Sequence, residues 1–200
     1  MSADKLIEKF KDLALPEAFK SSYLKDLLDI DGVVLAGGSI RDTLMNEIPK
    51  DYDIFFTSQE ALDKAREFLS KKMDKIAETA YTQTFREEIY EVQLVFKKIY
   101  DNKKQIISDF DFTPTMFAID NQGIAVGPTS LEDVSGKICR VNVITKPLSS
   151  LNRLVKYQDM KYDTKDAYYY ILSVMKTQPH GIILGGESSF YNDASDNDPK

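Results

Sequence analysis

The residues best suited to chemistry lie in residues 36–56, whose sequence is AGGSIRDTLMNEIPKDYDIFF. Asp51 and Asp53 are two residues apart in a segment with strand composition, and side chains at this spacing project from the same face of a strand. Two carboxylates on one face can hold a divalent metal ion. Upstream, the pair Gly37 and Gly38 lets the backbone approach a ligand closely and leaves amide groups for phosphate oxygens. The segment therefore predicts a site for a metal-bound nucleoside triphosphate.

The same segment resembles the opening signature of the polymerase-beta-like nucleotidyltransferases, in particular the head domain of class II CCA-adding enzymes and bacterial poly(A) polymerases. Their pattern is GG-x-x-RD followed closely by D-x-D. Six residues match it in order: Gly37, Gly38, Arg41, Asp42, Asp51 and Asp53. A second block, residues 111–141, follows the family's course through DFT, a short strand, a glycine turn and Leu-x-Asp-Val-x-Gly-Lys-x-x-Arg. The resemblance covers residues 32–176.

The resemblance implies a role for each matching residue. Asp51 and Asp53 are expected to bind Mg²⁺ or Mn²⁺ and to act in catalysis. Glu91, in IYEVQLVF, is favoured as a third carboxylate, and Asp109 and Asp111 compete for that role. The expected nucleotide-binding residues are Gly37, Gly38 and Ser39 around the phosphates, together with Arg41, Asp42, Asp111 and Arg153.

Two departures from the family pattern bear on substrate choice. Asp109 and Phe110 precede the DFT motif, where class II enzymes usually have two arginines, so positive charge is lost there. The family's Glu-Asp-x-x-Arg motif, which reads the base, aligns with Ser149, Ser150 and Arg153. A serine hydroxyl lacks the fixed acceptor geometry of a carboxylate, so selection of C and A is not expected to carry over. A helix packing contact is an equally open reading of Arg153.

Composition excludes several other kinds of site. The 200 residues contain one cysteine, Cys139, and one histidine, His180, so one chain cannot assemble a disulfide framework or a zinc cluster of several cysteines and histidines. The net charge of −6 argues against tight unspecific wrapping of nucleic acid. A basic patch for an RNA end is a candidate at four lysines, Lys97, Lys98, Lys103 and Lys104, although a solvated hairpin tip is the favoured reading of them.

The chain shows no signal-peptide core and no apolar run long enough for a bilayer, so we expect a cytoplasmic protein without a membrane partner. The composition, 42% hydrophobic, suffices for one real core. We expect an α+β fold with a nucleotidyltransferase-type mixed sheet flanked by helices. The expected parts are N-terminal helices in residues 1–30, a head domain in 31–146, a short helical neck in 147–178 and a disordered acidic tail in 179–200.

The expected elements follow from periodicity and punctuation. Helices are predicted over residues 5–13, 16–28, 39–46, 58–70, 147–160 and 164–176, and strands over 32–35, 52–56, 88–100, 106–110 and 116–119. Ser58 is expected to cap the helix that follows it. Five apolar residues would form one side of that helix: Ala61, Leu62, Ala65, Phe68 and Leu69. Thr113 and Pro114 are expected to start a short helical turn.

These observations favour an ATP- or other NTP-using nucleotidyltransferase that acts on a hydroxyl of an RNA end, a protein or a small molecule. The long body domains of transfer-RNA maturing relatives have no counterpart here, which makes CCA addition the less expected activity and a partner subunit a possible replacement. A nucleotide-binding or regulatory module with reduced catalysis is the main alternative. A structural protein that makes contacts through its eleven tyrosines is the third.

Overall fold

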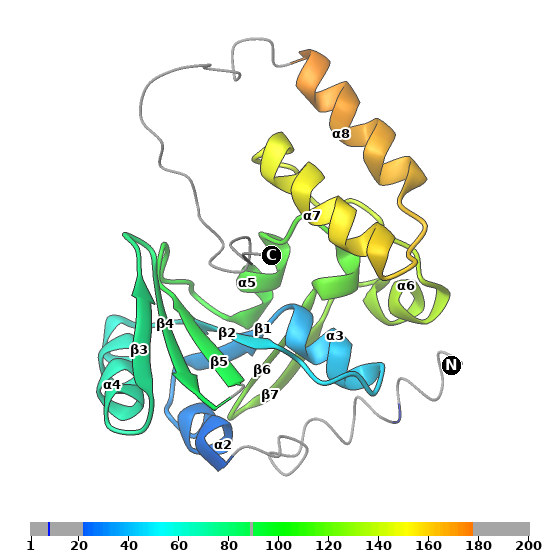
Figure 1. The fold of residues 1–200 in the computed structure, drawn as a ribbon. Helices are drawn as coiled ribbons and strands as arrows, with labels where there is room; N and C mark the ends of the chain where they lie inside the picture. The colour runs from blue at the N-terminus through cyan, green and yellow to red at the C-terminus, as the bar shows by residue number, and fades with distance from the viewer. Residues whose placement is uncertain (1–7, 9–21, 89, 178–200) are drawn as a thin grey trace.

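The computed structural model describes residues 8, 22–88 and 90–177. Within these ranges a seven-stranded mixed sheet is flanked by helices (Figure 1). The elements in chain order are α2 (Ser22–Leu28), β1 (Val33–Ala36), α3 (Gly38–Leu44), β2 (Asp51–Phe56), α4 (Gln59–Ser70), β3 (Asp74–Glu78), β4 (Thr82–Glu87), β5 (Tyr90–Val95), α5 (Lys103–Ser108), the 3₁₀ turn η2 (Thr113–Thr115), β6 (Phe117–Asp120), β7 (Gly123–Val126), α6 (Ser130–Gly136), α7 (Pro147–Asp159) and α8 (Lys165–Thr177). The expected fold class is confirmed.

The strand order of the sheet is β3-β4-β5-β2-β1-β6-β7. The central pair β2 and β5 is parallel, with Asp51 opposite Glu91 and Asp53 opposite Gln93. The other pairs are antiparallel, and Ala36 of β1 lies opposite Asp53. The strand β2, which carries Asp51 and Asp53, therefore lies in the middle of the sheet, hydrogen-bonded to β5 on one side and to β1 on the other.

The two faces of the sheet have separate apolar cores. Alternate strand residues such as Ile54, Phe56 and Leu94 pack with α2, α3 and α4 on one face. The opposite alternation, which includes Phe55 and Val95, packs with α5 on the other face. Asp51 and Asp53 share the parity of Phe55, so they project on the α5 face.

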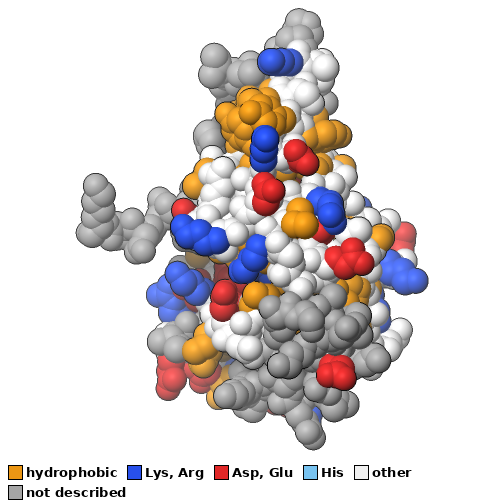
Figure 2. Space-filling view, turned by 90° about the vertical axis from the view of Figure 1, so that its right-hand side faces the viewer, with side chains coloured by type: hydrophobic (Ala, Val, Ile, Leu, Met, Phe, Trp, Pro, Cys, Tyr) orange, Lys and Arg blue, Asp and Glu red, His pale blue; other side chains and the backbone are white. Residues whose placement is uncertain are grey.

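The helices α7 and α8 form a third packed group with the segment around η2 (Figure 1). Phe112, Cys139, Leu154 and Tyr157 lie in its core. Figure 2 shows hydrophobic side chains exposed at the upper end of the molecule, where α8 carries three exposed tyrosines: Tyr168, Tyr169 and Tyr170. The first turns of α7 lie close to the α5 face of the sheet, which makes a junction between the two groups.

Most of the expected elements are present within one or two residues of their predicted ends. Ser58 caps α4, and its Oγ accepts a hydrogen bond of 3.1 Å from the amide of Ala61. The predicted apolar side of α4 is buried apart from Phe68, which is half-buried. The short turn at Thr113 is also confirmed as η2.

The predicted strand over residues 106–110 is wrong, because residues 106–108 form the end of the helix α5 and Asp109 caps it. The side chain of Asn102 accepts hydrogen bonds from the amides of Lys104 and Gln105, so the helix begins at Lys103, three residues before Ile106. Ile106 and Ile107 are both buried against the sheet, so two adjacent β-branched residues reflect tertiary packing rather than a strand.

The predicted strand over residues 88–100 is shorter in the structure, as β5 ends at Val95. Two further strands, β3 and β4, precede it and were not predicted, and the short helix α6 was also missed. Glu88 has a φ of 55° and lies in the turn between β4 and β5, at the position where the predicted strand begins. The helix predicted over residues 5–13, most of that over 16–28 and the expected tail lie outside the described residues.

Among the described helices, none is both long enough and apolar enough to cross a membrane.

Candidate active site

A pocket of about 320 Å³ opens on the α5 face of the sheet, between the central strands and the start of α7. Asp53 and Gln93 from the two parallel strands lie at one part of its wall, and Gly37 and Gly38 lie beside them. Aromatic rings form much of the remaining lining, from Phe55, Tyr100, Phe110, Phe112 and Tyr157. The pocket therefore combines an oxygen-rich strand face with aromatic surface that suits a nucleobase.

The carboxylate pair lies where the sequence predicts it. Asp51 is exposed and Asp53 is half-buried, and both project from one face of β2 with their Cα atoms about 7 Å apart. Of the two, Asp53 lines the pocket. Gln93 is its partner on β5, so its amide projects on the same side. Two carboxylates and a neighbouring amide oxygen are ligands that a hard divalent cation accepts.

Glu91 has a different environment from the one expected of a third metal ligand. It lies opposite Asp51 in the sheet, but its Oε1 accepts a hydrogen bond of 2.9 Å from Nε of Arg86 on β4, and the two groups form an ion pair. Across residues 22–88 and 90–177, no group of three Asp, Glu, His or Cys side chains is arranged to hold a metal. The residues fit a site with two carboxylates, which is the number Mg²⁺ commonly takes from a protein when phosphate oxygens supply the rest.

The glycine turn brings the backbone close to Asp53. Gly37 has a φ of 95°, a conformation that glycine adopts at no steric cost, and a Cβ at this position would lie 3.7 Å from Oδ2 of Asp53. Its amide donates a hydrogen bond of 3.0 Å to the carbonyl of Phe117. This amide is therefore engaged with the sheet. Ser39 is buried, and its hydroxyl lacks a hydrogen-bond partner among the described residues.

Arg41 and Asp42 lie on α3 behind the glycine turn. Nε of Arg41 donates a hydrogen bond of 2.7 Å to Asp42, and the guanidinium carbon lies 5.5 Å from the centre of the Tyr157 ring. Burial raises the pKa of Asp42, although the adjacent Arg41 opposes this shift. Arg41 is buried, so the structure places it as a cation that joins α3 to α7.

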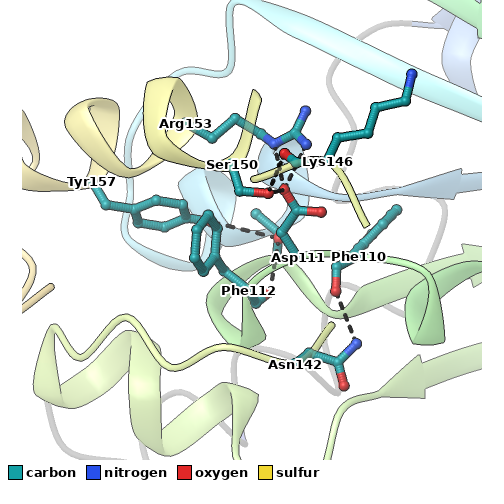
Figure 3. Close-up of polar contacts among 9 residues, drawn as sticks. Phe110, Asp111, Phe112, Asn142, Lys146, Ser150, Arg153 and Tyr157 are labelled. Carbon is teal, nitrogen blue, oxygen red and sulfur yellow. Dashed lines mark hydrogen bonds and ion pairs between the residues drawn. The ribbon is translucent and has the colours of Figure 1, made fainter. Parts of the chain in front are cut away.

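Asp111, in the DFT segment, is buried and bonded to α7 (Figure 3). Its Oδ2 accepts hydrogen bonds of 2.7 Å from Oγ of Ser150 and of 2.9 and 2.5 Å from Nε and Nη2 of Arg153. Three donors on one carboxylate oxygen fix the first two turns of α7 above the pocket. Ser150 is therefore directed to Asp111 and does not line the pocket. Ser149 and Arg153 do line it.

The aromatic side chains that line the pocket pack against one another. Phe112 and Tyr157 meet edge to face with ring centres 5.4 Å apart, and Phe55 packs on Phe110 at 5.7 Å. Tyr100 also lines the pocket, and burial and then the nearby Asp109 raise its pKa to about 12. A planar ligand would meet rigid rings on this side of the pocket.

Three of the residues predicted for the site from the sequence, Asp53, Asp111 and Arg153, line the pocket, but several other lining residues were not predicted. Gln93 has a detectable signal, because it follows Glu91 by two residues and so shares its strand face. Lys146 has no such signal, since its place depends on how α7 packs. Asp51, Ser39 and Glu91 are not among the described residues that line the pocket.

Comparisons with known proteins place the fold. A family described as "Gabija anti-defense 2 family protein" matches residues 7–137. No curated protein matches the chain. Among solved structures, the chain is similar to a CCA-adding enzyme in complex with ATP, with a TM-score of 0.59 and 14% identity over 86% of this chain and 45% of that one.

Two more solved structures are similar at lower scores. A Thermotoga maritima CCA-adding enzyme complexed with tRNA has a TM-score of 0.50 and 15% identity, over 77% of this chain and 38% of that one. A CCA-adding enzyme in complex with CTP has a TM-score of 0.50 and 16% identity, over 77% and 40%. The chain thus spans less than half of each enzyme's length, and at these identities the likeness establishes the nucleotidyltransferase fold.

Proposed function

The chain belongs to the Gabija anti-defense 2 family, and from this premise and its nucleotidyltransferase fold we propose that it transfers a nucleoside monophosphate from a nucleoside triphosphate to a hydroxyl group. The observation that carries the proposal is the position of Asp53. Its carboxylate lines a pocket beside Gly37 and Gly38, and Asp51 projects from the same strand face. Adjacent carboxylates beside a close backbone turn are what metal-dependent phosphoryl chemistry needs.

In this proposal Asp51 and Asp53 hold Mg²⁺ or Mn²⁺, with the amide oxygen of Gln93 beside them. When bound, the cation neutralises charge on phosphate oxygens and lowers the pKa of a coordinated hydroxyl. Glu91 lies opposite Asp51 and adds negative charge next to the cation site, while its carboxylate stays hydrogen-bonded to Arg86. Asp51, Asp53 and Gln93 keep their relative positions because β2 and β5 are hydrogen-bonded along this segment.

The reaction forms a bond between the acceptor oxygen and the α-phosphorus and breaks the bond from that phosphorus to the bridging oxygen. Pyrophosphate leaves with the electron pair, and the hydroxyl proton passes to solvent. Phe110 would position the base by stacking. Asp111 holds Arg153 at the pocket wall through two hydrogen bonds. Orientation of the nucleotide is thus assigned to the junction with α7.

The family description names an activity against the Gabija defence. We propose that nucleotidyl transfer in the cytoplasm serves that purpose, with an RNA end, a protein or a small molecule as acceptor. The similar solved structures contain ATP, tRNA or CTP, and this chain spans less than half the length of each. A partner subunit is a further candidate source of acceptor-binding surface in this proposal.

The test is transfer of label from each of the four α-labelled nucleoside triphosphates, with Mg²⁺ or Mn²⁺, to pooled cellular RNA and protein. The decisive variant is Asp51→Ala with Asp53→Ala. A matched control removes two exposed carboxylates elsewhere, Asp29→Ala with Asp74→Ala. We expect label with the wild type and the control and none with the first variant. Full transfer by the first variant would contradict the proposal.

A nucleotide-binding module without turnover is the second candidate, and one observation favours it. Glu91 is engaged by Arg86, and the described residues offer two carboxylates rather than a group of three. Calorimetry with each triphosphate separates the candidates when it is combined with the label assay. Metal-dependent binding without transfer to any acceptor would select the module, and repeated turnover would exclude it.

A further inference from the structure

The hairpin formed by α7 and α8 carries more apolar surface than it buries. Its two helices pack together through Leu151 and Leu154 on α7 and through Ala167 and Ile171 on α8. Figure 2 shows hydrophobic side chains at the surface of this end of the molecule. The exposed large apolar side chains of the hairpin are Leu148, Val155, Tyr168, Tyr169 and Tyr170. Because a surface helix normally has one apolar stripe, this second set marks a surface that a partner can cover.

Four apolar side chains lie on one side of the hairpin. Leu148 and Val155 are seven residues apart and share a face of α7, and Tyr168 shares a face of α8 with the half-buried Leu172. Each face lies about 80° round its helix from the line of contact between α7 and α8, in the same sense of rotation. Since the two helices run in opposite directions (Figure 1), the same sense of rotation leads to the same side. We call this side the outer face.

The outer face points away from the sheet. Ser150 of α7 is directed toward Asp111, which follows α5. At 100° per residue, Leu148 and Val155 lie roughly 140–160° round the helix from Ser150. A second molecule can therefore reach the outer face without covering the pocket.

Exposed charges at the two ends of the outer face indicate which partner fits it. Asp159 ends α7, Lys165 begins α8, and Lys176 lies in the last turn of α8. If α8 of a second copy lies antiparallel along α7, Lys165 of that copy meets Asp159, and two-fold symmetry repeats the pair. If α8 instead lies antiparallel against α8, Lys165 of one copy meets Lys176 of the other, and like charges oppose the contact.

The dimensions of the outer face suit a dimer that uses both helices. Each helix has 13 residues. The hairpin is therefore about 20 Å long and, with two adjacent helices, about 20 Å wide. A standard interface buries roughly 800 Å² of accessible surface on each partner, which a two-helix face approaches and a single short helix does not.

We propose that a second copy of this chain covers the outer face, so that α7 of each copy packs against α8 of the other in a four-helix bundle. A two-fold axis parallel to the hairpin produces this arrangement. Val155 of one copy then meets Tyr168 of the other inside the bundle, and Asp159 pairs with Lys165 at its end. The two sheets lie on opposite sides of the bundle with their pockets open. The dimer goes beyond the proposed nucleotidyl transfer and does not depend on it.

The experiment is sedimentation equilibrium of the full chain at concentrations from about 1 to 200 μM. Tyr168→Ser and Val155→Ser each remove one apolar group of the outer face. The matched control is Tyr170→Ser, because Tyr170 has a similar exposed fraction, 52% against 43% for Tyr168. Tyr170 lies about 200° round α8 from Tyr168, on the other side of the helix. Thermal melting of each variant confirms that the fold is intact.

We expect a wild-type dissociation constant of roughly 1–50 μM, as suits an interface at the small end of the stable range. Tyr168→Ser should raise it about tenfold or more, since symmetry removes the ring twice, and Val155→Ser should raise it about threefold. Tyr170→Ser should change it less than about twofold.

A charge exchange tests the arrangement of the helices. Asp159→Lys should raise the dissociation constant roughly tenfold, because it places like charges together at both ends of the bundle. Adding Lys165→Asp to that variant should return the constant to within about threefold of the wild type. A double variant that dimerises as weakly as Asp159→Lys would overturn the packing of α7 against α8.

A wild type that stays monomeric up to about 200 μM would overturn the dimer, and the outer face would then belong to another occupant, such as residues 178–200, a nucleic acid or a different protein. Equal weakening by Tyr168→Ser and Tyr170→Ser would overturn the assignment to the outer face. Weakening by Tyr168→Ser and Val155→Ser, with Tyr170→Ser unchanged and the charge exchange restoring association, would establish it.

Discussion

Asp133 and Asp53 show how one residue type serves two purposes in this molecule. Asp133 on α6 has no exposed surface, and its carboxylate accepts hydrogen bonds from Thr113 at 2.6 Å, from Thr129 at 2.7 Å and from Arg140. Asp53 is half-buried on a strand that borders a pocket. The first carboxylate is buried among donors, and the second lines a pocket that a ligand can enter.

The comparison shows that the role of a carboxylate depends on its surroundings, which are protein hydrogen-bond donors in one case and a ligand pocket in the other. The donors of Asp133 come from three segments of the chain, so its charge ties η2, α6 and the segment after α6 together. The wall around Asp53 leaves room for groups from outside the protein. Removing charge from the first should cost stability, and removing it from the second should cost chemistry.

The largest expected effect is that of Asp53→Asn on transfer. The change keeps the size of the side chain but removes the negative charge that holds the cation, so we expect transfer to fall on the order of a thousandfold. The melting temperature should stay within about 2 °C of the wild type. Steady-state transfer and thermal melting check this, and a large fall in melting temperature would assign Asp53 to the structural class.

The same substitution at Asp133 is expected to act on stability. Asn can accept fewer of the three hydrogen bonds and leaves Arg140 without its countercharge, so we expect about 3 kcal/mol less free energy of unfolding. Urea denaturation measures it, with Thr113→Val as a milder comparison of about 1 kcal/mol. An unchanged denaturation midpoint would break the contrast with Asp53.

Asp111 is expected to fall between the two regions. It is buried, but its partner Arg153 has a side chain that is 38% exposed, so water screens part of the interaction. We expect Asp111→Asn to cost about 1–2 kcal/mol of stability and to loosen α7. A double-mutant cycle with Arg153→Ala measures the coupling, and purely additive effects would argue against the link between the pocket and α7.

A small effect is expected for Glu91→Gln. Because Glu91 is paired with Arg86 at the rim of the sheet, we expect transfer to change less than about threefold. The label assay used for Asp53→Asn gives the comparison. A loss as large as that of Asp53→Asn would establish Glu91 as a third metal ligand.

The smallest expected effect concerns alkaline pH and Tyr100. Burial and Asp109 raise the folded-state pKa to about 12 from 10.0, so the folded protein keeps the phenol proton that the unfolded chain releases. The resulting stability is complete below pH 10 and is lost as the pH rises toward 12. Tyr100→Phe should flatten this loss in urea denaturation at pH 9 to 11.5, and an unaltered pH profile would contradict it.

Local patterns predicted the elements that carry their own signals. The cap at Ser58, the apolar face of α4 and the strand β2 depend on residues close in sequence, so they were placed correctly. The helix α5 was mistaken for a strand because adjacent isoleucines fit either structure, and packing against the sheet decided the outcome. The strands β3 and β4 were missed because their apolar alternation is weak, as β3 is mostly exposed.

The sequence by itself determined which residues have the chemistry: the paired aspartates, the glycine turn and the DFT segment share a short-range order that fixes their faces on one strand and one turn. Only the tertiary structure decided which of them meet. Asp111 and Arg153 are 42 residues apart, and their contact depends on how α7 packs on the sheet. Sequence periodicity specifies directions within an element, whereas the distance between elements is set by the apolar surfaces they bury together.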